Sequence, residues 1–160
     1  MTVHPRVSVV LVNYNGADDT LAALEGIQAL NWPAEQLDIV VVDNASSDDS
    51  VQKLQAVPGI TLIQSQENLG FAGGCNLGAS SSGGEIVAFL NNDARPDPDW
   101  LVHAAAGFDS SLRVGAVASR VLDWDGKTID YAGAGLTWYG MGYRPLSSHR
   151  ADRKKEAPAG

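Results

Sequence analysis

Three polar residues, Asn91, Asn92 and Asp93, directly follow the apolar run Ile86–Leu90. A continuous apolar run is typical of a strand that is covered on both faces in a parallel sheet. One carboxylate beside two amides offers hard oxygen ligands, which can hold a divalent cation that also binds substrate phosphates. Because Asn and Asp favour turns in any case, a turn without a ligand is the alternative interpretation.

The residues after this tripeptide predict a helix that begins near Pro98. Arg95 and Pro96 prevent the strand from continuing, and Asp97 is well placed as an N-cap with Pro98 as the first helical residue. Apolar residues then recur at helical spacing, namely Trp100, Leu101, Ala104, Ala105 and Phe108. The polar tripeptide therefore ends a strand at the edge of an open α/β sheet where ligands bind.

The chain before this point alternates between predicted strands and helices. Strands are expected over Val7–Val12, Leu37–Val42, Ile60–Gln64 and Ile86–Leu90, with helices over Ala17–Ala29, Ser46–Ala56 and the segment opened by Asn68–Gly78. The start of the second helix is assigned from a pattern like a capping box, Ser46 to Asp49. The alternation predicts an α/β fold with a doubly wound, mostly parallel, Rossmann-like sheet.

The C-terminal third predicts a small β extension. A fifth strand is expected over Val114–Val121, and a hairpin with strands Val121–Trp124 and Lys127–Tyr131 turns at Asp125-Gly126. Residues 1–143 are expected to form one domain. Residues 144–160 carry 5 Lys and Arg against 2 Asp and Glu, a net charge of +3. This basic tail is predicted to be flexible, with attraction to anionic lipid head groups as the functional alternative.

Composition excludes several classes of function. Residues 1–143 carry 6 Lys and Arg against 17 Asp and Glu, a net charge of −11, which argues against nucleic acid as a partner. The longest apolar runs are far shorter than the roughly 20 residues of a membrane span. The single cysteine, Cys75, cannot form an internal disulfide and is expected to be inert. These features favour a cytoplasmic protein.

The predicted topology gathers residues that are distant in sequence. Right-handed crossovers place the carboxyl ends of all parallel strands on one edge, so Tyr14, Asp43, the Gly-rich Asn68–Gly78 and Asp93 are expected to converge. A dinucleotide site needs G-x-G-x-x-G in the first strand–helix turn, and the turn Asn13–Gly16 has one glycine. Dinucleotide and P-loop chemistry are therefore disfavoured.

The converging residues match the parts of a nucleoside diphosphate. Tyr14 offers a flat face for a base, and Asp43 stands where a carboxylate commonly accepts hydrogen bonds from a ribose. Backbone N–H groups around Gly70–Gly74 can approach a phosphate closely because glycine lacks Cβ. Asp93 can hold a metal that bridges the two phosphates. We therefore expect a nucleoside-diphosphate ligand.

Four segments also resemble those of a known family. They are VVLVNYNG, VVVDNASSDDS, NLGFAGGCNLG and LNNDARPDPDWL, in this order. Together they resemble the family 2 glycosyltransferases, which are inverting enzymes of the GT-A fold. The similarity covers roughly Val7–Leu122 and is greatest to the rhamnosyl- and galactofuranosyltransferase-like branch of cell-surface polysaccharide synthesis.

The resemblance implies a role for each matching residue at the nucleotide. The Val12 backbone and Tyr14 would contact the base, and Asp43 the base or ribose. Further donor contacts are implied for Asn68, which could instead cap a helix, and for Gly70 and Gly73.

The polar tripeptide falls on the DxD motif of the family. Asp93 would bind Mg²⁺ or Mn²⁺, and Asn92 would contact the nucleotide sugar. Asn91 replaces the first aspartate of the motif, which removes a charge but permits a hydrogen bond to the ribose.

The resemblance further implies direct displacement at the anomeric carbon, with a general base that deprotonates the hydroxyl of a saccharide or lipid-linked acceptor. The hairpin acids Asp123, Asp125 and Asp130 are weak candidates, so the base is expected beyond Gly160. The chain would then be a donor-binding half. The alternative is a non-catalytic nucleotide-sugar-binding module. A homodimer and an association with the inner face of the plasma membrane are also predicted.

Overall fold

The computed structural model describes residues 4–108, 113–132, 135–136 and 142–143. Contacts divide the chain into two compact units, Met1–Ala105 and Ala106–Gly160. The expected single domain over residues 1–143 stays a prediction, and the basic tail 144–160 lies outside the described residues. Among the helices that the structure describes, none combines the length and apolarity needed to cross a membrane.

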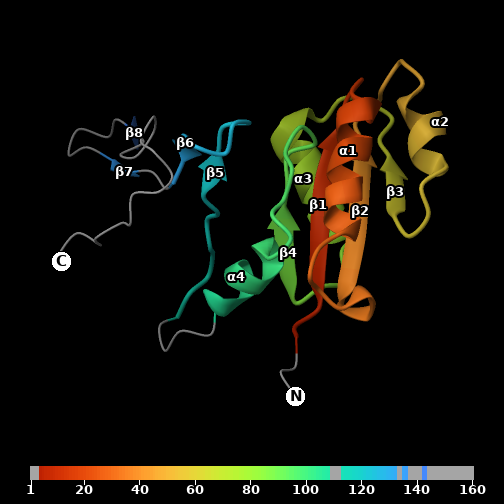
Figure 1. The fold of residues 1–160 in the computed structure, drawn as a ribbon. Coiled ribbons are helices and arrows are strands. Elements are labelled where there is room, and N and C mark those ends of the chain that lie inside the picture. The colour runs from red at the N-terminus through yellow and green to blue at the C-terminus, as the bar shows by residue number, and fades with distance from the viewer. Residues whose placement is uncertain (1–3, 109–112, 133–134, 137–141, 144–160) are drawn as a thin grey trace. The chain divides into compact units, whose positions relative to one another are not determined.

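The first unit is built on one parallel sheet, as the sequence predicts (Figure 1). Its strands are β1 (Val7–Asn13), β2 (Leu37–Asp43), β3 (Thr61–Gln64) and β4 (Ile86–Phe89). They lie in the order β3-β2-β1-β4, so β1 and β2 are central. In the register of β1 and β2, Ser8 is opposite Asp38 and Asn13 is opposite Asp43. The two central strands therefore end at the same level.

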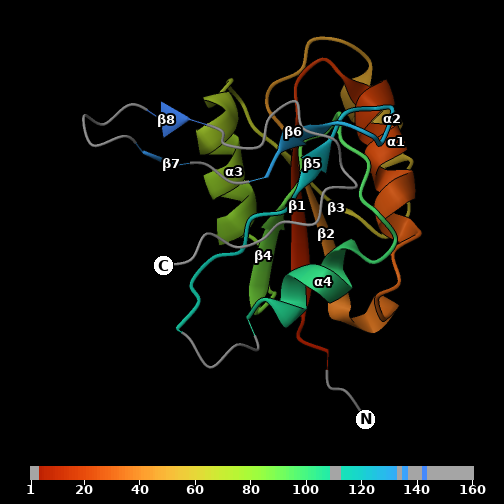
Figure 2. The same ribbon diagram turned by 60° about the vertical axis from the view of Figure 1, so that its left-hand side comes forward.

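Helices cover both faces of this sheet. They are α1 (Ala17–Gln28), α2 (Ser50–Gln55), α3 (Gly70–Ser80) and α4 (Trp100–Ala106), with a short 3-10 turn η1 (Ala34–Gln36) before β2. Figures 1 and 2 show α1 and α3 on opposite sides of the sheet. This is the doubly wound α/β arrangement predicted from the sequence, and it is confirmed.

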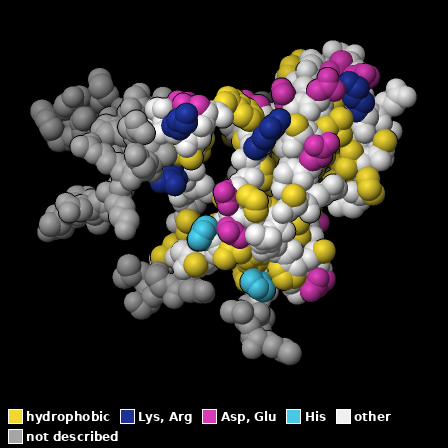
Figure 3. Space-filling model, viewed as in Figure 1, with side chains coloured by type: hydrophobic (Ala, Val, Ile, Leu, Met, Phe, Trp, Pro, Cys, Tyr) yellow, Lys and Arg dark blue, Asp and Glu magenta, His cyan; other side chains and the backbone are white. Residues whose placement is uncertain are grey.

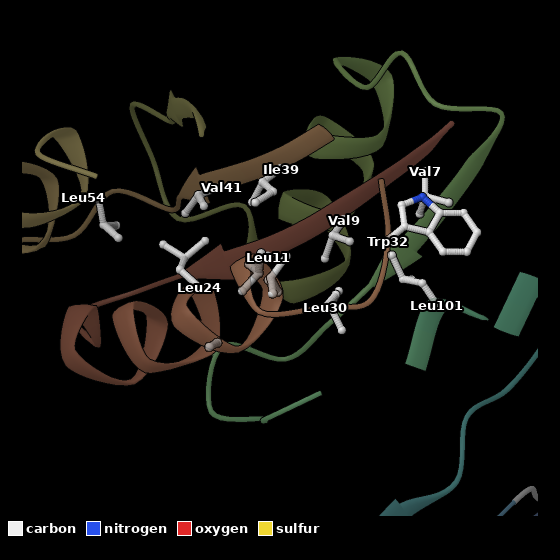
Figure 4. Close-up of a cluster of buried hydrophobic side chains, with 12 residues drawn as sticks. Val7, Val9, Leu11, Leu24, Leu30, Trp32, Ile39, Val41, Leu54 and Leu101 are labelled. Carbon is white, nitrogen blue, oxygen red and sulfur yellow. The ribbon is translucent and has the colours of Figure 1, made fainter. Parts of the chain in front are cut away.

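The main core lies between the sheet and α1. Val7, Val9 and Leu11 alternate along β1 and face Leu24 and Ile27 of α1, with all five side chains at most 1% exposed. Leu54 of α2 and Leu101 of α4 join the same cluster (Figure 4). Burial of this apolar surface is the principal force that fixes α1 against β1.

The opposite face of the sheet is covered by α3, and glycines permit its close approach. A Cβ added at Gly74 would lie 2.8 Å from Val12 Cγ1, and one added at Gly78 would overlap Val10. The Gly-rich segment therefore serves helix–sheet packing over much of its length. Only its first residues lie near the carboxyl edge of the sheet.

Strand β4 differs from its prediction as a strand covered on both faces. It is one of the two edge strands of the described sheet, and Phe89 is 50% exposed. The apolar run correctly predicts a strand, but it cannot say whether a neighbour covers each face. Leu90 continues the ladder by one bond, from its N–H to Val10 O at 3.1 Å.

Two predicted helix starts are wrong. Helix α2 begins at Ser50 instead of Ser46, because the Ser46 hydroxyl donates to Asp43 and does not cap a helix. Helix α4 begins at Trp100 instead of Pro98. Asp97 forms a turn there, since its Oδ1 accepts a hydrogen bond from the Asp99 N–H at 2.9 Å.

The second unit contains short antiparallel pairs. Strands β5 (Val121–Leu122) and β6 (Ile129–Tyr131) form the predicted hairpin, and β7 (Gly135–Leu136) pairs with β8 (Gly142–Tyr143). The fifth strand predicted over Val114–Val121 is wrong, because residues 113–120 form neither helix nor strand. Its β-branched residues favour a strand, but strand formation also needs a hydrogen-bonded neighbour.

Candidate functional site

A buried polar pair marks the carboxyl ends of β1 and β2. Asn13 is 0% and Asp43 is 1% exposed, and Asn13 Nδ2 donates to Asp43 Oδ1 at 2.8 Å. A buried carboxylate is tolerated only with several hydrogen-bond donors. The loop after β2 supplies them, since the Ser46 N–H donates to Oδ2 at 3.0 Å and the Ser46 hydroxyl donates to Oδ1 at 2.6 Å.

The loops after β1 and β2 are bonded to each other. The Asn15 N–H donates to Ser46 Oγ at 2.9 Å, and the Ser47 N–H donates to Asn15 Oδ1 at 2.8 Å. Asn15 and Ala45 both have left-handed backbone conformations, with φ of 51° and 64°. Such conformations cost energy for residues other than glycine and persist where surrounding contacts impose them.

Asn44 joins this cluster to the start of α3. It is 3% exposed, its Nδ2 donates to Asn68 Oδ1 at 2.9 Å, and its Oδ1 accepts from the Leu69 N–H at 2.9 Å. Asn68 Oδ1 also accepts from the Gly70 N–H at 2.8 Å. Asn68 thus orders the helix start, and the Gly70 amide is engaged by the protein in this conformation.

The tripeptide Asn91-Asn92-Asp93 forms a tight turn after β4, with the Ala94 N–H donating to Asn91 O at 3.1 Å. Asp93 is exposed at this turn. Asn92 Nδ2 donates to Thr20 Oγ1 on α1 at 3.2 Å, and Thr20 donates to Asn13 Oδ1 at 2.8 Å. We call residues 91–94 the Asp93 turn. Hydrogen bonds connect it to the buried pair.

The Asp93 turn suits a cation that a ligand helps to hold. Among the described residues, no group of three or more His, Cys, Asp or Glu could hold a metal ion. Mg²⁺ is commonly bound by one or two carboxylates together with substrate phosphates. One exposed carboxylate flanked by amides therefore fits a metal that arrives with a diphosphate.

The remaining predicted residues differ in their surroundings. Tyr14 is 51% exposed, so its ring can meet a ligand. Val12 is partly buried and contacts α3 near Gly74. Gly73 lies within α3, where an added Cβ would be 2.7 Å from Leu69 Cβ. The Asp43 carboxylate is enclosed by the protein's own donors.

Sequence reasoning did not assign Asn13, Asn15, Thr20, Asn44 or Ser46 to this site. One signal was available for Thr20. It shares a helical stripe with Ala17, Leu24 and Ile27, and a hydroxyl on a buried stripe needs a polar partner.

A second polar feature lies beside the site, in a depression at the N-terminal ends of α1 and α2. Lys53 Nζ is 2.8 Å from Asp18 Oδ1 and 3.3 Å from Asp49 Oδ2. Figure 3 shows acidic and basic side chains together over this end of the two helices. The hydrogen bond to Asp18, followed by that to Asp49, raises the pKa of Lys53. The lysine thus ties α2 to the start of α1.

Comparison with known proteins identifies relatives of this chain. The pattern of glycosyl transferase family 2 matches residues 8–154. Glycosyltransferase AglE of Haloferax volcanii is 30% identical over 101 residues, which are 61% of this chain and 33% of that protein. The chain thus spans about a third of the length of this curated relative.

Two solved structures share the fold. Mannosyltransferase PcManGT of Pyrobaculum calidifontis, in complex with GDP-Man and Mn²⁺, has a TM-score of 0.64 and 31% identity, covering 69% of this chain and 34% of that chain. Staphylococcus aureus TarS 1-349, in complex with UDP-GlcNAc, has a TM-score of 0.57 and 25% identity, covering 65% and 31%.

Proposed function

Because this chain belongs to glycosyl transferase family 2, we propose that it binds the nucleoside-diphosphate sugar of a glycosyl transfer at the carboxyl edge of its sheet. One observation carries the proposal. A continuous hydrogen-bonded network links the Asp93 turn, through Thr20 and Asn13, to the loop after β2. The places expected for nucleoside and metal thus belong to one ordered structure.

The nucleoside end of the proposed site is the surface around Tyr14. Its exposed ring would stack on the base, and the adjacent Val12 backbone would contact the same base. Asp43 would act through the loop it organises, since its two oxygens already accept three hydrogen bonds. A direct contact between Asp43 and the nucleotide remains a prediction, as do those of Asn68, Gly70 and Gly73.

Asp93 would hold Mg²⁺ or Mn²⁺ together with the diphosphate, with Asn91 and Asn92 supplying neutral oxygens nearby. The Mn²⁺ complex of the related mannosyltransferase supports this assignment. When bound, the metal supplies Lewis-acid stabilisation of the leaving diphosphate. Asp93 itself would place one negative charge beside that metal.

The donor is proposed to be dTDP- or UDP-linked, with a rhamnosyl or galactofuranosyl group as the sugar. The related structures hold GDP-Man and UDP-GlcNAc, so guanosine belongs in the same test. The acceptor would be a saccharide or a lipid-linked saccharide in cell-surface polysaccharide synthesis. Cytoplasmic location, membrane association and a homodimer remain predictions.

Transfer with inversion also requires a general base, and we propose that the hairpin acids Asp123, Asp125 and Asp130 do not supply it. Asp125 supports this view, because its Oδ1 accepts hydrogen bonds from the Lys127 and Thr128 N–H groups and so orders the turn. The alternative is that the chain is a nucleotide-sugar-binding module without catalysis. Binding of the donor would be common to both functions.

The test is calorimetric titration of UDP, dTDP and GDP in Mn²⁺ and in EDTA. We expect Asp93→Asn to lower the affinity in Mn²⁺ at least tenfold and to leave the affinity in EDTA unchanged. Asp97→Asn is the matched control, because it removes the same charge four residues away and an asparagine retains the turn. Equal affinities for Asp93→Asn and the wild type in Mn²⁺ would contradict the metal assignment. Failure of all three nucleotides to bind the wild type would contradict the proposed function.

A further inference from the structure

We propose that Thr20 is a positioning residue that couples the Asp93 turn to the loops of the nucleoside end. This inference rests on the proposed function. Thr20 lies on α1 and is 0% exposed, so its side chain cannot contact a ligand itself. It would act through Asn92 on one side and Asn13 on the other.

The hydroxyl of Thr20 stands between three groups. It lies 2.8 Å from Asn13 Oδ1, 3.1 Å from Gly16 O and 3.2 Å from Asn92 Nδ2. A hydroxyl has one proton to donate and two lone pairs to accept. Thr20 therefore shares its one proton between Asn13 Oδ1, the shorter contact, and Gly16 O. It accepts from Asn92, which fixes the orientation of the Asn92 amide beside Asp93.

The connection continues from Asn13 to the loop after β2. Asn13 Nδ2 donates to Asp43 Oδ1 at 2.8 Å and to Ser46 Oγ at 3.1 Å. The path from the Asp93 turn to this loop thus has three successive hydrogen bonds, through Asn92, Thr20 and Asn13. Buried polar networks of this kind hold their members in one arrangement when every group is satisfied.

Helix α1 also holds the rest of the segment that carries Asp93. A Cβ added at Gly26 would lie 2.9 Å from Pro96 Cδ, so this part of the segment packs directly on the helix. Further along, the Asn31 N–H donates to Pro98 O at 2.8 Å, and Asn31 Nδ2 donates to Asp99 Oδ1 at 2.8 Å. The segment therefore runs beside α1 and the residues that follow it, and Thr20 bonds the residue next to Asp93.

A simpler role for Thr20 would be that of a helix hydroxyl bonded to the carbonyl four residues earlier. The bond to Gly16 O fits that role, but the role does not explain the hydrogen bonds with Asn13 and Asn92. The two roles differ in what they predict for ligand binding. A purely structural Thr20 affects stability alone, whereas a positioning Thr20 affects how strongly metal and nucleotide promote each other's binding.

The experiment measures the ratio of nucleotide dissociation constants in EDTA and in Mn²⁺, which reports the coupling between the two ligands. We expect Thr20→Val to lower this ratio at least fivefold while changing the constant in EDTA less than twofold. Thr20→Ser keeps the hydroxyl and should restore the ratio. Without any ligand, hydrogen exchange at the Ala94 N–H should be at least tenfold faster in Thr20→Val.

Two further variants keep the test decisive. Ser8→Ala removes another buried, doubly bonded hydroxyl at the opposite end of β1, so it should lower stability and leave the ratio unchanged. Gly26→Ala displaces Pro96 without touching Thr20, and it should lower the ratio even if Thr20→Val does not fold. An unchanged ratio in folded Thr20→Val, or in Gly26→Ala where Thr20→Val does not fold, would overturn this inference alone when the wild type binds normally. Absence of nucleotide binding by the wild type would overturn the proposed function and the inference with it.

Discussion

Strands β1 and β2 carry a polar pair at each end, and the two pairs differ in their connections. At the amino end, Ser8 Oγ donates to Asp38 Oδ2 at 2.9 Å and accepts from the Gly84 N–H at 2.9 Å. At the carboxyl end, Asn13 and Asp43 are bonded to each other, to Thr20 and to Ser46. The first pair bonds one further segment, at Gly84 before β4, whereas the second joins several loops.

The difference follows from the topology of a parallel sheet. Loops that leave the carboxyl ends of the strands lead into helices on both faces, so a polar residue there can reach several segments. At the amino end, Gly84 lies so close to Ser8 that an added Cβ would be 2.6 Å from the Ser8 N–H nitrogen. Similar cross-strand pairs thus stabilise the fold at one end and organise a site at the other.

The largest effect is expected for Asn13→Ala. This change removes the partner of Asp43, Ser46 and Thr20 at a position that is 0% exposed. Leaving buried polar groups unsatisfied should lower the free energy of unfolding by about 3 kcal/mol. Urea denaturation provides the measurement. A loss no larger than that of Ser8→Ala would remove the distinction between the two ends.

Ser8→Ala should have an intermediate effect. Asp38 is only partly buried, so water can replace the lost hydroxyl and the free energy of unfolding should fall by about 1 kcal/mol. Nucleotide affinity should be unchanged, because no bond of this pair reaches the carboxyl edge. Calorimetry on the same preparation checks this, and a weakened affinity would show that the two ends are coupled.

Lys53→Met should have the smallest effect on the free energy of unfolding. It tests the contact between α1 and α2 beside the site. The bond to Asp18 raises the pKa of Lys53 above its ordinary value of 10.5. A raised lysine pKa contributes stability below 10.5 and loses it as the pH rises through the folded-state value. The stability difference from the wild type should therefore be small at pH 8, shrink in 1 M salt and vanish at strongly alkaline pH.

Urea denaturation across this pH range tests the lysine prediction. Gln52→Met is the control, since it places the same side chain at an exposed neighbour on α2. A stability difference that persists after Lys53 loses its proton would assign the effect to packing instead of charge.

The strands and their common edge could be predicted because apolar runs stop at polar residues. Val7–Val12 and Leu37–Val42 end at Asn13 and Asp43 in the sequence, and the structure pairs these two residues. The parallel order of strands followed from the alternation with helices. Local sequence patterns were sufficient for features that depend on the residues of a single strand or helix.

The remaining features depend on contacts between distant elements. Ser46 matches a helix-capping pattern, but its hydroxyl donates to Asp43 instead. A buried carboxylate is stable only when hydrogen-bond donors surround it. Likewise, Gly74 belongs to the segment expected to approach a phosphate, but packing on Val12 requires a glycine there. The spacing of residues in the sequence does not show which of two possible contacts a residue makes in the fold.

The left-handed conformations of Asn15 and Ala45 have a kinetic consequence. Each residue lies two positions beyond the end of its strand, and hydrogen bonds of the protein itself, between the two loops, hold both conformations. The ordering of these loops thus belongs to folding and adds nothing to the barrier for binding. Nucleotide association should accordingly proceed in one phase, with an observed rate that rises linearly with nucleotide concentration.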